Sequence, residues 1–152
     1  MLKNLLRTSD DKVIAFLRLV VAIVVFPHGA QKVLGWFGGF GFSGTMGFLT
    51  QQVHLPAPIA ILVPTAEFLA PIFLFVGLLG RLAAFGIAAD YLAVAVAAHL
   101  KNGFFMNWTG QQKGEGVEYF ILAIAIAVAV MIRGSGAWSI DRTLSRDTAP
   151  PR

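Results

Sequence analysis

The sequence predicts an all-α, integral-membrane four-helix bundle with both termini in the cytoplasm, on three observations. First, 57% of the 152 residues are hydrophobic and 13% are charged, about half the ~25% charge of an ordinary soluble domain. Second, the hydrophobic residues lie in four segments that approach the ~20 residues a spanning helix needs. Third, the basic residues gather on one side of these segments. The composition and the mean hydropathy of +0.72 exclude a disordered chain and a nucleic-acid-binding arm.

The four expected spans cover residues 13–34, 57–79, 82–100 and 117–133. The fourth is short, and it fits the bilayer if Arg133 extends its side chain outward from the end. Within it, residues 121–130 alternate large apolar residues with alanine. A barrel strand would need polar lumen residues at those positions, so a helix is predicted. A cleaved signal peptide is disfavoured for the first segment, because His28 stands where a small residue should precede cleavage.

Lysine and arginine are distributed unevenly between the two sides of the predicted bundle. Eight lie before the first span, in the turn after the second span, or at and beyond the end of the fourth, whereas three lie at the opposite side. Positive residues near span ends stay on the cytoplasmic side. Residues 1–12 are therefore predicted to be a cytoplasmic segment, and residues 142–152 a flexible cytoplasmic tail. The two long connections, 35–56 and 101–116, should face outward together.

The first long connection is rich in glycine and aromatic residues. Residues 35–47 contain six glycines and four aromatics. Glycine permits sharp turns and close packing, whereas Trp and Phe favour the membrane interface. The segment lacks the Lys-Ser/Thr end of a phosphate-binding loop. Two interpretations remain open, an interfacial aromatic anchor and a re-entrant cover over a site.

Ionisable residues inside the predicted spans identify candidate pairs, because each costs several kcal/mol unless it is paired or hydrated. Arg18 lies near the inner end of the first span, and its long side chain can reach Asp90 in the third. We expect Arg18 and Asp90 to form a buried structural ion pair, and a part in a proton path is the alternative. Glu67 lies near the middle of the second span, where Pro71 leaves its carbonyl without a helical donor. A carboxyl at that depth needs a basic partner.

Further polar residues lie in the outer halves of the spans and can converge with Glu67. His28 and Lys32 share a helix face at i and i+4, and His99 lies where the third span ends. We expect Glu67 within hydrogen-bond or ion-pair reach of His28, Lys32 or His99. A titratable carboxylate beside histidine suits proton-coupled chemistry, so Glu67, His28 and His99 are the predicted catalytic residues. The predicted ligand-binding residues around them are Lys32, Gln31, Trp36, Lys101, Asn102, Glu118 and Tyr119.

Several of these residues occur in an order that resembles the DoxX family. The motifs that carry the resemblance are His28-Gly-Ala-Gln-Lys32, Gly35-Trp-Phe-Gly-Gly39, the mid-span Glu67, His99-Leu-Lys-Asn-Gly-Phe-Phe105 and Glu118-Tyr119. The resemblance covers residues 13 to about 141. The resemblance implies a multi-pass protein of the bacterial inner (plasma) membrane with a redox-linked role. Family members are associated with a terminal quinol oxidase and with thiosulfate–quinone oxidoreduction, and relatives are linked to oxidative-stress complexes. It does not define a reaction.

The leading interpretation is a redox-linked subunit that binds a quinone-like or other small lipophilic molecule in an outer-leaflet polar pocket. Quinone carbonyls need donors such as His28, His99 or Lys32, and quinol oxidation needs a proton acceptor such as Glu67. The chain has no cysteine and no flavin or nicotinamide motif, so it would act as an oxidoreductase only with partners. No metal site is expected, and haem held by His28 and His99 is disfavoured because nothing else indicates a porphyrin cavity.

The alternative interpretation is a non-enzymatic membrane scaffold or assembly factor for a respiratory or oxidative-stress complex. In that case the polar residues tie the helices together and bind no ligand. Either interpretation predicts the lipid bilayer as a partner, together with a membrane-protein complex or a homo-oligomer, and no nucleic acid.

Overall fold

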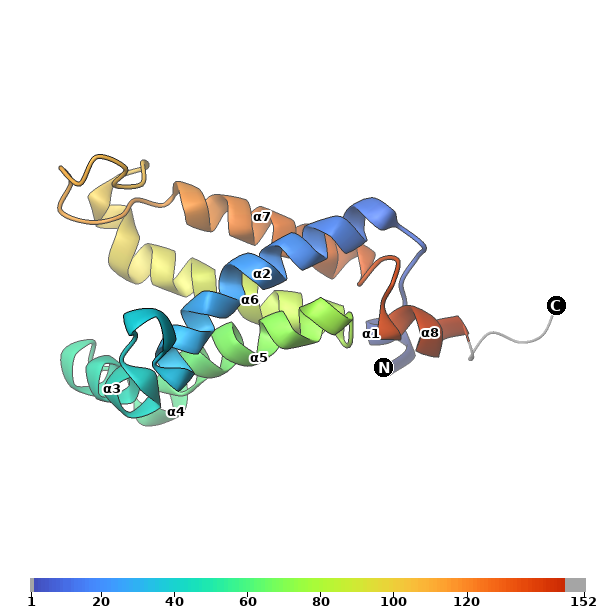
Figure 1. Cartoon of the computed structure of the whole chain (residues 1–152), viewed down its shortest axis with the longest axis horizontal. Coiled ribbons are helices and arrows are strands. Elements are labelled where there is room, and N and C mark those ends of the chain that lie inside the picture. The colour runs from blue at the N-terminus through green and yellow to red at the C-terminus, as the bar shows by residue number, and fades with distance from the viewer. Residues whose placement is uncertain (1, 147–152) are drawn as a thin grey trace.

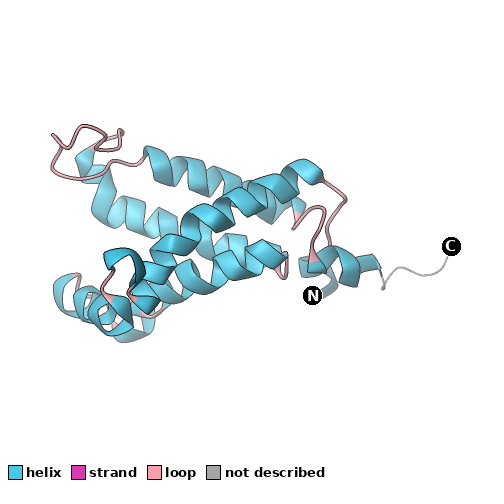
Figure 2. Ribbon diagram, viewed as in Figure 1, coloured by secondary structure: helices cyan, strands magenta, loops and turns pink. Residues whose placement is uncertain are grey.

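In the computed structural model, residues 2–146 are described, and their regular secondary structure is entirely helical (Figures 1 and 2). The four longest helices are α2 (Lys12–Leu34), α5 (Leu62–Val76), α6 (Gly80–Val94) and α7 (Glu118–Arg133). Helices α2 and α6 each pack against both α5 and α7, so the four close into a ring. The shorter helices are α1 (Leu2–Leu6), α3 (Gly41–Gly47), α4 (Ala57–Ala60) and α8 (Ile140–Arg146).

Among the described residues, three helical stretches are long and apolar enough to cross a membrane. They are Lys12–Leu34, Ala57–Val76 and Gly80–Asn102. The third extends α6 through a π-helical turn, Ala95–His99, and a 3-10 turn, Leu100–Asn102. Helix α7 has 16 residues and is about 24 Å long at ~1.5 Å per residue, less than the ~30 Å of hydrocarbon. The chain is therefore a membrane protein whose described residues form an all-helical fold, as the hydropathy predicts.

The surface and core of the bundle follow from the apolar composition of these helices. Large apolar side chains such as Phe16, Phe85 and Leu122 are exposed on the outside, where lipid would cover them. The buried core contains many small residues, among them Ala84 on α6 and Ala127 on α7. Small residues let helices approach closely in lipid, where apolar burial alone gives little drive for association.

The ends of α2 carry the local signals that begin and end a helix. The Asp11 side chain accepts hydrogen bonds from the backbone N–H of Val13 at 3.0 Å and of Ile14 at 3.1 Å. The bond from Ile14 contributes most to holding the pKa of the Asp11 carboxyl below its usual 3.8, and Arg133 lowers it further. At the other end Gly35 adopts φ 72°, a left-handed conformation that glycine adopts without strain.

The two ends of the bundle are built differently. Helices α1 and α8 lie against each other at one end, whereas α3, α4 and the 103–117 loop lie at the opposite end (Figure 1). Residues 142–152 were predicted to form a flexible tail, but residues 142–146 belong to α8 and Arg142 forms an ion pair with Asp10. The rest of that tail, residues 147–152, lies outside the described residues.

Arg18 does not form the expected ion pair with Asp90. The residue is 1% exposed and lies at the end of the bundle near α1 and α8. Its guanidinium nitrogens donate hydrogen bonds to the carbonyl oxygens of Leu74, Phe75, Ala137 and Trp138. The last carbonyls of a helix lack intrahelical donors and carry partial negative charge, so an arginine there stabilises the end of α5. Arg18 therefore reaches the C-terminal end of α5, about two turns from Glu67.

Asp141 fastens the segment after α7 to the turn between α5 and α6. It is fully buried, and its carboxylate accepts hydrogen bonds from the backbone N–H of Leu79 at 2.8 Å and of Gly80 at 2.9 Å. It also accepts one from the Ser135 hydroxyl at 2.5 Å. A Cβ at Gly80 would lie 2.1 Å from the Ser135 hydroxyl oxygen, so the turn requires glycine there. These contacts complete the start of α6, whose first N–H groups have no helical partner.

Replacing Asp141 by alanine is expected to lower the free energy of unfolding by about 2–4 kcal/mol, because it leaves buried N–H and O–H donors unpaired. Unfolding of the purified protein in mixed detergent micelles measures the change. Asp10→Ala is the matched control, since it breaks an ion pair whose carboxylate is exposed and should cost under about 1 kcal/mol. Equal losses in the two variants would contradict the role given to Asp141.

Candidate ligand-binding site

A polar cavity of about 200 Å³ lies at the end of the bundle opposite α1 and α8. All four long helices contribute to it, together with the π-helical turn after α6 and the 103–117 loop. Its lining residues are His28, Lys32, Glu67, Tyr91, Val94, His99, Met106, Glu115, Tyr119 and Phe120. The structure thus brings together the three predicted catalytic residues and two of the predicted ligand-binding residues, Lys32 and Tyr119.

The central contact of this cavity is an ion pair between Lys32 on α2 and Glu67 on α5. The Lys32 ammonium donates a hydrogen bond to Glu67 Oε2. Glu67 is 4% exposed, and the Lys32 side chain is about one-third exposed. Glu67 therefore has the basic partner that its depth requires. An isolated charge at this position would be costly, and the pairing offsets part of that cost.

The two helices can make this contact because Gly29 lets them approach closely. A Cβ at Gly29 would lie 2.1 Å from the Glu67 carbonyl oxygen, which no side chain can occupy. Pro71 supplies no N–H to that carbonyl, so the carbonyl is free of its helical bond and lies against α2. Lys32 follows Gly29 by about one helical turn and therefore meets the Glu67 side chain.

Asp90 extends the polar contacts of Glu67 to α6. Its carboxyl lies within hydrogen-bonding reach of the Glu67 carboxyl and interacts electrostatically with Lys32. Asp90 Oδ2 is buried and has no hydrogen-bond donor within the described residues. Asp90 was expected beside Arg18, and the structure places it beside Glu67 instead. Three helices therefore meet at Glu67.

A pair of tyrosines joins α6 to α7 in the cavity wall. The hydroxyl oxygens of Tyr91 and Tyr119 are 3.1 Å apart, and the ring of His28 lies 5.9 Å from that of Tyr119. Tyr119 was predicted to bind a ligand, whereas Tyr91 was not predicted. The available signal was chemical, because a tyrosine in a span needs a partner for its hydroxyl.

The loop at residues 103–117 closes the cavity on its outer side. His99 Nδ1 lies 2.9 Å from the Glu115 carbonyl oxygen, so it acts as the donor and leaves Nε2 for other contacts. Glu118 Oε1 accepts hydrogen bonds from the Met106 backbone N–H at 2.8 Å and from Trp108 Nε1 at 3.0 Å. These contacts hold Met106 and Glu115 over the cavity. Neither residue was predicted to lie at the site, because nothing in the sequence of the loop shows that the loop folds back over the cavity.

Five predicted ligand-binding residues do not line the cavity. They are Gln31, Trp36, Lys101, Asn102 and Glu118. Gln31 donates to the Phe37 carbonyl, Asn102 donates to the Glu115 carbonyl, and Glu118 holds the loop as described. Lys101 is exposed, and Trp36 is 53% exposed. These residues shape the surroundings of the cavity rather than its wall.

The glycine- and aromatic-rich connection folds beside the cavity without covering it. It forms a 3-10 turn at Trp36–Gly38, then α3 and a π-helical turn at Phe48–Gln52, and none of its residues line the cavity. Thr45 ties it to α2 by donating to the Lys32 carbonyl at 3.0 Å. Phe37 and Phe40 are exposed, which fits the interfacial anchor better than the re-entrant cover.

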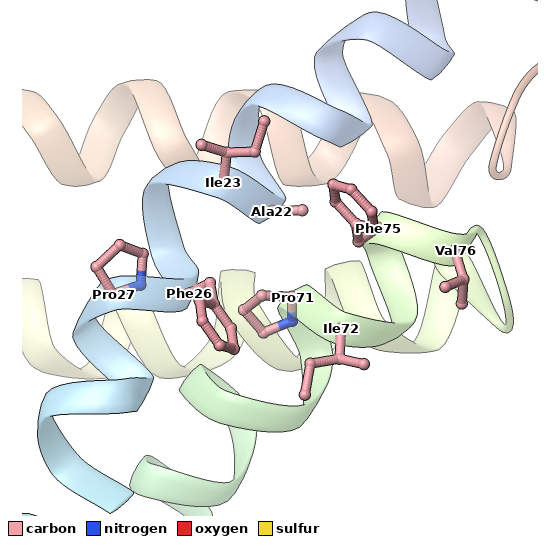
Figure 3. Close-up of a pocket in the computed structure, with 8 residues that line it drawn as sticks. All are labelled: Ala22, Ile23, Phe26, Pro27, Pro71, Ile72, Phe75 and Val76. Carbon is pink, nitrogen blue, oxygen red and sulfur yellow. The ribbon is translucent and has the colours of Figure 1, made fainter. Parts of the chain in front are cut away.

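A second cavity, of about 460 Å³, lies on the outer side of the α2–α5 contact (Figure 3). Its lining side chains come from one face of α2 and one face of α5. They are Ala22, Ile23, Phe26, Pro27, Pro71, Ile72, Phe75 and Val76. All are apolar, so the shape of this groove suits a hydrocarbon chain, and its lining has no polar or ionisable side chain that could take part in a reaction.

We expect Gly29→Ala to separate α2 from α5 and to lower the free energy of unfolding by about 3 kcal/mol or more, because the new methyl overlaps the Glu67 backbone. Gly86→Ala is the matched control. A Cβ at Gly86 would meet nothing within 4 Å, so that change should be neutral or stabilise by up to ~1 kcal/mol. Unfolding of both variants in detergent provides the measurement. A tolerated Gly29→Ala would contradict the close approach.

The DoxX family profile matches residues 13–100 of the chain. This range covers more than half of the sequence and contains α2, the glycine-rich connection, α5 and α6. It includes His28, Lys32, Glu67, Asp90 and His99. Comparisons with curated proteins and with solved structures each gave no match. The match over most of the apolar part of the sequence shows that the chain belongs to the DoxX family.

Proposed function

We propose that this protein is a redox-linked membrane subunit that binds a quinone-like or other small lipophilic molecule in the polar cavity. The observation that carries the proposal is the convergence of the Lys32–Glu67 ion pair with His28, His99 and a tyrosine pair in one cavity. Small-molecule sites typically have a few convergent polar groups set among apolar walls. Here the apolar walls are Val94, Met106 and Phe120.

The size of the cavity indicates which part of such a molecule it would hold. Its volume of about 200 Å³ is below the ~300–1,000 Å³ of sites that enclose a drug-sized ligand. A single ring with its carbonyl groups is the appropriate size, and a hydrophobic tail would remain in the lipid. This arrangement places the polar headgroup against the polar residues and keeps the tail in hydrocarbon.

Different lining residues would contact different groups of a quinone-like ring. The Lys32 ammonium and a histidine N–H are donors for its carbonyl oxygens, and the tyrosine hydroxyls can donate or accept. Glu67 and the histidines are groups that can take up a proton from a reduced ring. The chain has no cysteine and thus no cysteine-held cluster. Electrons would have to pass to or from a partner protein, so any oxidoreductase activity belongs to the assembly.

We further propose that α7 is the fourth span and that both termini face the cytoplasm of a bacterial inner membrane. Arg133 at the end of α7 can extend its side chain toward water, which compensates for the short helix. The end of the bundle formed by α1 and α8 carries Arg7, Arg81, Arg133 and Arg142. An excess of basic residues at one end supports a cytoplasmic location for it.

Single cysteines test the orientation of the spans that precede α7, because the chain has no cysteine of its own. Thr109→Cys lies in the 103–117 loop and Ser9→Cys lies between α1 and α2, and both positions are exposed. In intact cells a membrane-impermeant maleimide should label Thr109→Cys and not Ser9→Cys, and both should react after the cells are broken. The opposite labelling pattern would reverse the orientation, and labelling of both in intact cells would refute three crossings between the two positions.

Ligand binding is tested by filling the cavity without changing its charges. Val94→Phe adds a ring to the cavity wall, and overpacking that costs about 1–3 kcal/mol should weaken binding roughly 5- to 150-fold. Val96→Phe is the matched control on the same helical stretch, because Val96 is 62% exposed to the outside. Equilibrium binding of menadione and of a short-chain ubiquinone to the protein in detergent provides the measurement.

The same measurement separates the proposal from a scaffold role. If the wild-type protein binds neither quinone, or if both variants bind as the wild type does, the ligand proposal is wrong. A protein that supports its membrane complex equally well as Val94→Phe and as wild type would instead favour the scaffold. In that case the cavity residues serve to join the four helices.

A further inference from the structure

Glu67, which lines the polar cavity, and Asp90, which interacts with it from α6, together exceed the fixed positive charge available there. Glu67 of α5 and Asp90 of α6 lie within hydrogen-bonding reach of each other. Lys32 is the one lysine or arginine among the residues that line the cavity. Arg18, which could have supplied a second cation, is committed to backbone carbonyls at the other end of α5. Two ionised carboxylates would therefore leave an excess negative charge in a water-poor site.

The hydrogen bonds show the same imbalance. Glu67 accepts from Lys32, whereas Asp90 Oδ2 is buried and has no donor within the described residues. A buried acceptor without a donor costs free energy. A proton on one carboxyl would convert an acceptor into a donor and give the pair an O–H···O bond. When two carboxyl groups share a site, one of them keeps its proton, because two negative charges at close range repel each other strongly.

The remaining titratable groups around the pair do not remove this imbalance. His28 on α2 interacts with both Glu67 and Lys32, and its ring packs against Tyr119 of α7. Tyr91 of α6 and Tyr119 share a hydrogen bond, and both are neutral in ordinary conditions. His99 is held by the Glu115 carbonyl at the outer side of the cavity. Lys32 alone therefore faces the two carboxyls with a permanent charge.

We propose that Glu67 and Asp90 form a proton-binding pair that holds one exchangeable proton beside the cavity, while Lys32 balances the one remaining negative charge. The ligand of this site is the proton itself. The inference goes beyond the proposed function, because the pair holds its proton whether the cavity is empty or occupied. It also changes the role of Asp90 from a structural partner of Arg18 to a member of the proton-binding site.

Infrared spectroscopy of the purified protein in an ester-free detergent tests the proposal, because a protonated carboxylic acid has its own C=O stretching band. At neutral pH the difference spectrum between wild type and Asp90→Asn should contain one such band, and the band should shift in D₂O. The difference spectrum between wild type and Glu67→Gln should contain the same band, since Asp90 left alone beside Lys32 would ionise. Asp10→Asn is the matched control, because its carboxylate is exposed and paired with Arg142.

Every outcome of this experiment bears on the proposal. Loss of the band in both variants supports the pair, and its persistence in either variant overturns it, as does its absence from the wild type. The amide replacements match a protonated carboxyl in shape, so monodisperse, helical protein is expected. Asp90→Glu is a second check that should keep a protonated-acid band at a shifted frequency. No quinone is present, so failure of this test is distinct from failure of ligand binding.

Discussion

The ion pair between Lys32 and Glu67 is the contact on which the polar end of the bundle depends, because it connects a charge that lipid cannot tolerate to the packing of two helices. The pair forms because Gly29 brings α2 against the backbone of α5. Asp90 of α6 interacts with the Glu67 carboxyl of this pair. The His28 ring of α2 packs against the Tyr119 ring of α7. Removing the close approach at Gly29 would therefore disturb the helix packing and the cavity chemistry together.

The sequence predicted the helices well because hydropathy and length are local properties of each segment. Three of the expected spans match helical stretches that are apolar enough to cross a membrane. The partner of Glu67 was predictable for a related reason, because an unpaired carboxyl at that depth is too costly to persist. Lys32 was one of three basic residues at a suitable height along the helices. Depth along a helix and electrostatic cost were sufficient for that prediction.

The direction of long side chains and the conformation of the loops could not be predicted from depth and electrostatic cost. The Arg18–Asp90 pair was wrong because depth along a span does not show which way a long side chain extends. Backbone carbonyls at the end of α5 also compete for a guanidinium, and the sequence pattern does not display them. Met106 and Glu115 reach the cavity through the fold of the 103–117 loop. That fold depends on hydrogen bonds from Glu118 and His99, which no local pattern reveals.

Each end of the bundle has one buried side-chain polar atom without a partner among the described residues, Arg18 Nε near α1 and α8 and Asp90 Oδ2 near the cavity. At the end near α1 and α8, Arg18 and Arg81 donate to the last carbonyls of α5 and α7, and Asp141 accepts from the first N–H groups of α6. Charges there complete the ends of helices. At the cavity end a buried carboxyl oxygen of Asp90 lacks a donor. A buried acceptor without a donor costs free energy, and the proton proposed to be shared between Asp90 and Glu67 would remove that cost.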